Sequence, residues 1–202
     1  MMKKIALIVL LAFTLFGAQL QEAQRLFRIG DEKAAIEILT KSCDSGLLDS
    51  CIMLGNFYFS NDKRKFEYEK AVDLYAKACD GGNLLGCDRL AGAYYEGRGV
   101  KQDFTFAAKF AMQACDGEIS YSCIVLANLH YYGNGVIKDH AQALKFYERA
   151  CELETASSCV MAAKMHEKGE GAPKDIQKSL LYHDKACALG AKSSCDKAQN
   201  LK

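Results

Sequence analysis

The chain has 202 residues, with 26 lysines and arginines against 25 aspartates and glutamates, and a formal net charge of +1. This balance, without a run of basic residues, argues against a nucleic-acid-binding surface, which needs clustered positive charge. A single proline, frequent alanine and no tryptophan favour an all-helical chain over one built from strands.

The N-terminal stretch has the layout of a secretory signal. A positive start, Met1–Lys4, precedes an uncharged apolar run, 5–16, and then the small residues Gly17 and Ala18. We therefore predict a signal peptide over residues 1–18. The alternatives are a membrane anchor or a buried first helix, but the run is shorter than the ~20 residues that span a bilayer. We expect export to the bacterial periplasm or beyond, with no stable membrane anchor after cleavage.

Residues 19–42 predict a helix pair that caps the chain. Apolar residues at helical spacing indicate helices over 19–29 and 33–39, joined by a turn at Gly30 and Asp31. This pair contains no pair of cysteines, and terminal units of repeat arrays are commonly atypical.

A unit of 36 residues then repeats along the rest of the chain. It is defined by two cysteine columns, eight residues apart, that use all ten cysteines of the protein: Cys43, Cys79, Cys115, Cys151 and Cys187, followed by Cys51, Cys87, Cys123, Cys159 and Cys195. We divide the chain into repeats at 43–78, 79–114, 115–150 and 151–186, with a capping half-repeat at 187–202. A strict period of this length is typical of stacked helix pairs.

Each repeat predicts two helices. In the repeat at 79–114, a helix of about three turns carries Leu90 and ends at the glycines Gly97 and Gly99, where a left-handed turn costs glycine little. Asp103 then occupies the position that begins the second helix. The first repeat has 60–63 in place of the glycine pair, so we expect a differently shaped loop there.

The cysteine spacing predicts disulfides within each repeat. Residues eight apart in one helix lie ~12 Å apart along its axis, whereas a disulfide needs Cα atoms roughly 4.4–6.8 Å apart. Turn residues such as Asp80 to Asn83 let the chain reverse between the two cysteines. The alternative is a zinc site that uses cysteines of two repeats, although ligand pairs in such sites are usually two to four residues apart. No Cys-x-x-Cys redox motif is present.

The pattern Leu-x-x-x-Tyr-x-x-Gly-x-Gly-Val, seen from Leu90 to Val100 and followed by Asp103, resembles the Sel1-like repeat, a relative of the tetratricopeptide repeat. With the cysteine pairs and the signal segment, the chain resembles the secreted cysteine-rich Hcp β-lactamase family. The resemblance implies an all-α, right-handed superhelical solenoid of antiparallel, disulfide-linked helix pairs. It also implies penicillin binding with weak β-lactamase activity, or a role in protein interactions.

The sequence does not supply catalytic residues for the hydrolase. The Ser-x-x-Lys motif of serine β-lactamases occurs at Ser60–Lys63 and Ser194–Lys197, about as often as chance predicts, and the Ser-Asp-Asn and Lys-Thr-Gly motifs are absent. We therefore assign no catalytic residue.

The four histidines do not form a metal site either. His130, His140, His166 and His183 lack close ligand spacing. His130 and His166 occupy a column that is tyrosine in earlier repeats, which predicts a packing role. We expect neither a metal nor another cofactor.

The superhelix predicts a concave groove along the first helices. The candidate ligand-binding residues of this groove are Asn56, Arg89, Asn128, Met161 and Lys164. Amide groups can bind an extended peptide backbone, and a basic side chain can hold a carboxylate. We expect a monomer whose partner is a protein, a peptide, a peptidoglycan-like fragment or a β-lactam; the alternative is a merely solvated polar face.

Overall fold

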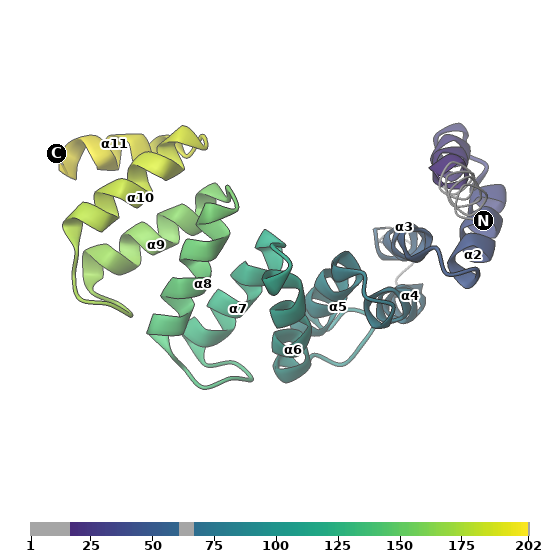
Figure 1. Cartoon of the computed structure of the whole chain (residues 1–202), viewed down its shortest axis with the longest axis horizontal. Coiled ribbons are helices and arrows are strands. Elements are labelled where there is room, and N and C mark those ends of the chain that lie inside the picture. The colour runs from purple at the N-terminus through teal and green to yellow at the C-terminus, as the bar shows by residue number, and fades with distance from the viewer. Residues whose placement is uncertain (1–16, 61–66, 202) are drawn as a thin grey trace, which may run out of the picture. The chain divides into compact units, whose positions relative to one another are not determined.

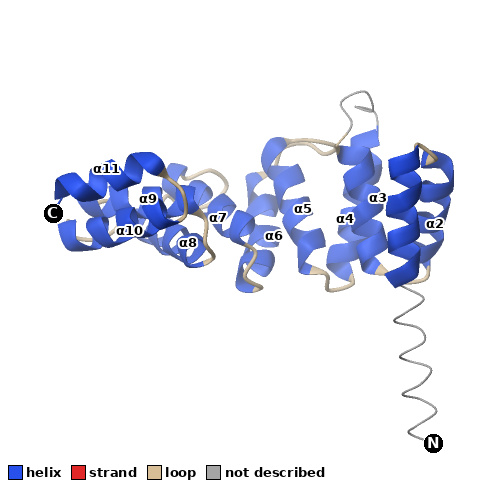
Figure 2. Cartoon of the chain, turned by 90° about the horizontal axis from the view of Figure 1, so that it is seen from above, coloured by secondary structure: helices blue, strands red, loops and turns tan. Residues whose placement is uncertain are grey.

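The computed structural model describes residues 17–60 and 67–201, and the predicted signal segment up to residue 16 lies outside them. The described residues form helices and loops without a strand (Figures 1 and 2). After a helix over residues 17–29, the helices are α2 (Glu32–Asp44), α3 (Leu48–Phe59), α4 (Tyr68–Asp80), α5 (Leu84–Glu96), α6 (Phe104–Asp116), α7 (Ser120–Tyr132), α8 (His140–Glu152), α9 (Ala156–Lys168), α10 (Ile176–Ala188) and α11 (Lys192–Leu201).

The chain divides into two compact units, Met1–Gly86 and Cys87–Lys202. In the first unit, the helix over 17–29 packs with α2 and α3 around Ala23, Leu39 and Leu54. In the second unit, each helix from α6 to α11 packs against the next one along the chain. The predicted pairing of consecutive helices is therefore present within each unit.

The starts of the second helices follow the prediction, with one exception. Asp103, Asp139 and Asp175 each precede a second helix, and their carboxylates accept hydrogen bonds from backbone N–H groups of the first turn. These bonds satisfy donors that no helical carbonyl can reach. Glu67 stands at the same position before α4 but makes no side-chain cap. The unusual loop predicted at 60–63 lies largely outside the described residues.

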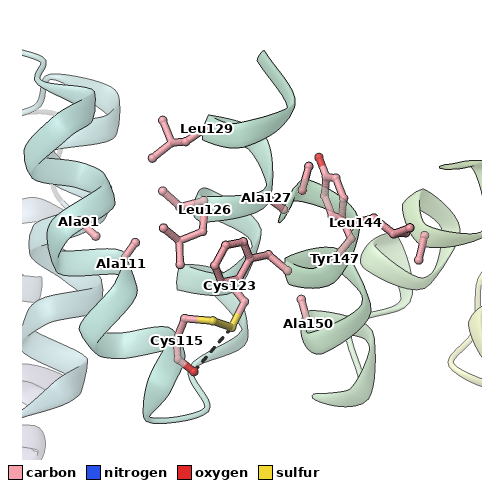
Figure 3. Close-up of a cluster of buried hydrophobic side chains, with 14 of the residues drawn as sticks. Ala91, Ala111, Cys115, Cys123, Leu126, Ala127, Leu129, Leu144, Tyr147 and Ala150 are labelled. Atoms are coloured by element: carbon pink, nitrogen blue, oxygen red, sulfur yellow. Dashed lines mark hydrogen bonds between the residues drawn. A yellow bond between two sulfur atoms is a disulfide. The ribbon is translucent and has the colours of Figure 1, made fainter. Parts of the chain in front are cut away.

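The core consists of the columns that the repeat predicts. Small residues at the helix crossings are fully buried, namely Ala71, Ala107, Ala143 and Ser179. Figure 3 shows the centre of the second unit, where Leu126 and Leu129 of α7 point toward Ala111 and Ala91. The small side chains allow the helix backbones to approach closely, and the leucines fill the space between them.

Within the described residues, none of the helices combines the length and the apolar character that a membrane span requires.

Candidate functional site

Disulfides close the turns between consecutive helices. Cys43–Cys51, Cys115–Cys123, Cys151–Cys159 and Cys187–Cys195 have S–S distances of 2.00–2.07 Å and Cα–Cα distances of 4.7–4.8 Å. Cys79 and Cys87 are disulfide-bonded as well, and no cysteine of the described chain is free. The predicted disulfides are confirmed, and the zinc alternative, which requires thiolates, does not apply.

The candidate asparagines are held by tyrosines that the sequence analysis did not identify. The Tyr75 hydroxyl donates to Asn56 Oδ1 over 2.9 Å, and the Tyr147 hydroxyl donates to Asn128 Oδ1 over 2.6 Å. Burial raises the pKa of Tyr147 to about 12, so this hydroxyl keeps its proton. Each bond occupies an amide oxygen and leaves the amide nitrogen as a donor.

The same register holds different residues in the last full repeat. There, Lys164 replaces the asparagine and His183 replaces the tyrosine. Lys164 is exposed, whereas His183 is only 3% exposed and contacts Ser194, with 3.2 Å between its Nδ1 and the serine Oγ. Burial lowers the pKa of His183, so the ring is neutral near pH 7.

The other two candidates differ in their surroundings. Arg89 is exposed on α5, and its Nη1 lies 3.6 Å from Oδ2 of the buried Asp88. Met161 is half-buried and packs against the core of the second unit. A basic side chain is therefore available to a ligand at Arg89, while Met161 contributes mainly to packing.

Asp88 is a buried carboxylate that sequence reasoning missed. It is 2% exposed, and the Ser122 hydroxyl of α7 donates to its Oδ1 over 2.7 Å. Desolvation raises the pKa of Asp88, although the hydrogen bond from Ser122 and the nearby Arg89 charge oppose this effect.

Two of the histidines pack as predicted. The His130 ring stacks on Phe146 with centroids 5.7 Å apart, and the His166 ring stacks on Tyr182 at 5.6 Å. Buried His166 also places its Nε2 2.8 Å from Oε1 of Glu148, a contact that the sequence did not predict. No group of histidine, cysteine, aspartate and glutamate in the described part of the chain is arranged to hold a metal ion.

A cavity of about 860 Å³ is lined by side chains of α9, α10 and α11 and of the loop before α10. Ser194 and Lys197, one of the two Ser-x-x-Lys pairs, both line it. However, Ser194 is 1% exposed, and buried serines recur at its position in other repeats, at Ser50, Ser122 and Ser158. This recurrence indicates a small packing residue instead of a nucleophile. Lys63 of the other pair lies outside the described residues.

Comparison with protein families gives four matches to the Sel1 repeat, at residues 48–83, 85–118, 120–154 and 156–190. The first of these matches begins with α3. The family model therefore places the start of each repeat at its first helix, whereas our division of the sequence starts each repeat at the first cysteine. No curated protein matches the sequence.

Several solved structures are similar. The chain is 24% identical to c5321, described as a protective antigen of uropathogenic Escherichia coli strains with an SLR fold, with a TM-score of 0.79 over 86% of this chain and 38% of that one. It therefore spans well under half the length of c5321. A Sel1 repeat protein from Oxalobacter formigenes is 21% identical, with a TM-score of 0.76 over 89% and 73%. Helicobacter pylori cysteine rich protein B is 30% identical, with a TM-score of 0.51 over 65% and 94%.

Proposed function

Because the chain belongs to the Sel1 repeat family, we propose that it is a binding scaffold that holds an extended segment of a partner protein along its first helices. Stacked helix pairs present continuous surfaces of this kind. We give the name first-helix face of the second unit to three polar residues of its first helices, the half-buried Asn128 and the exposed Arg89 and Lys164. Asn56 occupies the register of Asn128 in the first unit.

The observation that carries the proposal is the repeated asparagine–tyrosine pair. A tyrosine hydroxyl holds the oxygen of Asn56 and of Asn128, which fixes each amide and presents its nitrogen as a donor. A peptide in extended conformation offers a backbone carbonyl to such a donor whatever its side chains are. In the first unit, Asn56 also lines a cavity of about 680 Å³ together with Phe27 and Met53.

The disulfides are typical of a protein that works in an oxidising compartment. We propose that this compartment is the periplasm or the outside of the cell, as the predicted signal segment indicates. The partner is then an exported protein or a peptide fragment of the cell wall.

Selection from a displayed random peptide library on the oxidised protein tests the proposal. The variant Asn128→Asp retains the oxygen that accepts from Tyr147 but removes the amide donor. We expect it to lower the affinity for the selected peptides about fivefold, which corresponds to the free energy of one hydrogen bond. Asn134→Asp, which makes the same chemical change in the loop after α7, should leave binding unchanged. Equal losses in the two variants, or no selected peptide, would contradict binding at this face.

The β-lactam hydrolase that the Hcp resemblance implies is the alternative. A purified, oxidised sample with a chromogenic cephalosporin separates the two functions. Turnover abolished by Ser194→Ala or by another single polar substitution would favour the hydrolase. Turnover that survives every such substitution would point to a contaminant and leave binding as the function.

A further inference from the structure

The cavity between α9, α10 and α11 is unusually rich in positive charge. Four of its lining residues are lysines, Lys164, Lys168, Lys174 and Lys197, and one is the acidic Glu167. The chain as a whole is nearly neutral, with a net charge of +1. The excess of lysine is therefore a local property of this cavity.

Two of these lysines have no carboxylate partner among the described residues. Lys197 pairs with Glu167 over 3.0 Å, and Lys168 lies 3.7 Å from Glu170. In the part of the chain that the structure describes, Lys164 and Lys174 form no ion pair, and both are exposed. Both ammonium groups are thus available to an anion that enters the cavity.

The wall of the cavity also holds a polar pair. His183 Nδ1 lies 3.2 Å from the Ser194 Oγ, and the neutral ring carries a single N–H, at Nδ1 or at Nε2 according to which of the two groups donates. His183 Nε2 is buried and has no partner within the described residues. In the tautomer in which Ser194 donates to Nδ1, Nε2 carries the N–H, and an unused donor of this kind favours an acceptor such as a carboxylate oxygen.

Lys164 connects this cavity to the first-helix face, because it occupies the register of Asn56 and Asn128. We propose that the cavity is the anion subsite of that face and takes a glutamate or aspartate side chain of the bound segment. Asn128 then holds the backbone of the segment, and Lys164 and Lys174 hold its carboxylate. Val160 and the lysine methylene groups contact the aliphatic part of the acidic side chain. This inference rests on the proposed function and adds the chemical class of the ligand.

A fluorescein-labelled, ten-residue peptide with three glutamates provides the probe, and its glutamine counterpart provides the comparison. Fluorescence anisotropy should show at least tenfold tighter binding of the glutamate peptide, with the difference shrinking as salt is raised, because salt screens exposed charges. The double variant Lys164→Gln/Lys174→Gln should lose this tenfold preference.

The matched control is Lys101→Gln/Lys138→Gln, which removes the same charge from exposed lysines outside the cavity. It should change binding less than twofold, and circular dichroism should show that all variants are folded. An equal loss of affinity in the control would mean that the overall charge of the protein causes the effect, and it would overturn the subsite. Inorganic phosphate that displaces the labelled peptide at the same concentration as an unlabelled glutamate peptide would overturn it as well.

The two proposals fail in different ways. If both peptides bind equally well and Asn128→Asp weakens both, the anion subsite is wrong and the binding face stands. If the glutamate peptide does not bind at millimolar concentration, while library-selected neutral peptides do, the subsite is again overturned. If no peptide of any kind binds, both proposals are wrong.

Discussion

Asp88 illustrates how one buried residue couples stability to pH. Its pKa is raised, chiefly by desolvation, so the folded chain holds this proton more tightly than the unfolded chain does. Stability therefore falls as the pH rises through the pKa of the folded state. Asp88→Asn keeps an oxygen that accepts from Ser122 and removes the charge. We expect it to raise the free energy of unfolding at pH 7, and the gain should vanish below about pH 4, where the unfolded carboxyl is also protonated.

Urea unfolding across this pH range measures the effect. The control Asp196→Asn changes an exposed carboxylate of α11, and it should stay within about 0.5 kcal/mol of the wild type. A loss of stability in Asp88→Asn at pH 7 would show that the Arg89 charge stabilises the carboxylate by more than its burial costs.

Gly171 carries a second prediction, because it is confined both by its backbone and by a neighbour. Its φ is +83°, and a Cβ placed there would lie 2.2 Å from the carbonyl oxygen of His140. Gly190 has a similar φ of +94°, but a Cβ placed there would meet no neighbouring atom within 4 Å. We expect Gly171→Ala to lower the free energy of unfolding by about 3 kcal/mol and Gly190→Ala by about 1 kcal/mol. Similar losses in thermal unfolding would mean that the contact with His140 contributes nothing.

The sequence predicts the role of a residue well when equivalent residues recur at the same position of each repeat. It predicts poorly which residues of different helices contact one another. The packing role of His130 and His166 followed from their alignment with tyrosines, and the structure confirms it. The tyrosines that hold Asn56 and Asn128 stand on the next helix, 19 residues along the chain. That recurring spacing was a usable signal, but it becomes meaningful only once the crossing of the two helices is known.

At the scale of elements, the disulfide of each helix–turn–helix junction should stabilise by limiting the unfolded chain. Replacing Cys151 and Cys159 by alanine should lower the free energy of unfolding by ~2–3 kcal/mol, the entropy of closing a loop of this size. Urea unfolding without reductant measures the loss. With dithiothreitol present, the variant and the wild type should have similar free energies of unfolding. If the difference between them stays undiminished, the loss comes from packing of the sulfur atoms and not from the cross-link.

Each turn between two disulfide-linked helices contains one residue with positive φ, and in two of the turns this residue is not a glycine. Gly46, Gly82 and Gly190 have positive φ there, but the same register holds Glu118 and Glu154, with φ of +65° and +61°. A left-handed non-glycine residue costs about 1–2 kcal/mol, and the greater freedom of unfolded glycine offsets roughly 0.5–1 kcal/mol of that.

Glu154→Gly should therefore stabilise the chain by about 0.5–1 kcal/mol in urea unfolding. The control Glu152→Gly makes the same change at the last residue of α8, in helical backbone, and should destabilise by up to about 1 kcal/mol. A stability loss in both variants would contradict the strain at residue 154.

For the whole molecule, the 36-residue period was enough to predict an all-helical stack of cross-linked pairs, because each repeat buries its apolar columns against its neighbours. The lysine-lined cavity was not predictable in this way. Three of its lysines come from three different segments: Lys164 lies on α9, Lys197 lies on α11, and Lys174 lies in the loop that precedes α10. No two of them occupy the same column of the repeat. Only the packing of these three segments brings their charges together.

Binding of an extended segment along the first helices is tested most directly by photo-cross-linking. A library-selected peptide that carries p-benzoylphenylalanine is irradiated on the oxidised protein, and the adducts are located by peptide mapping. We predict adducts on α7 and α9, in the fragments that contain Asn128 and Lys164. Adducts confined to exposed residues of α6 and α8, such as Met112 and Lys145, would contradict the proposed face.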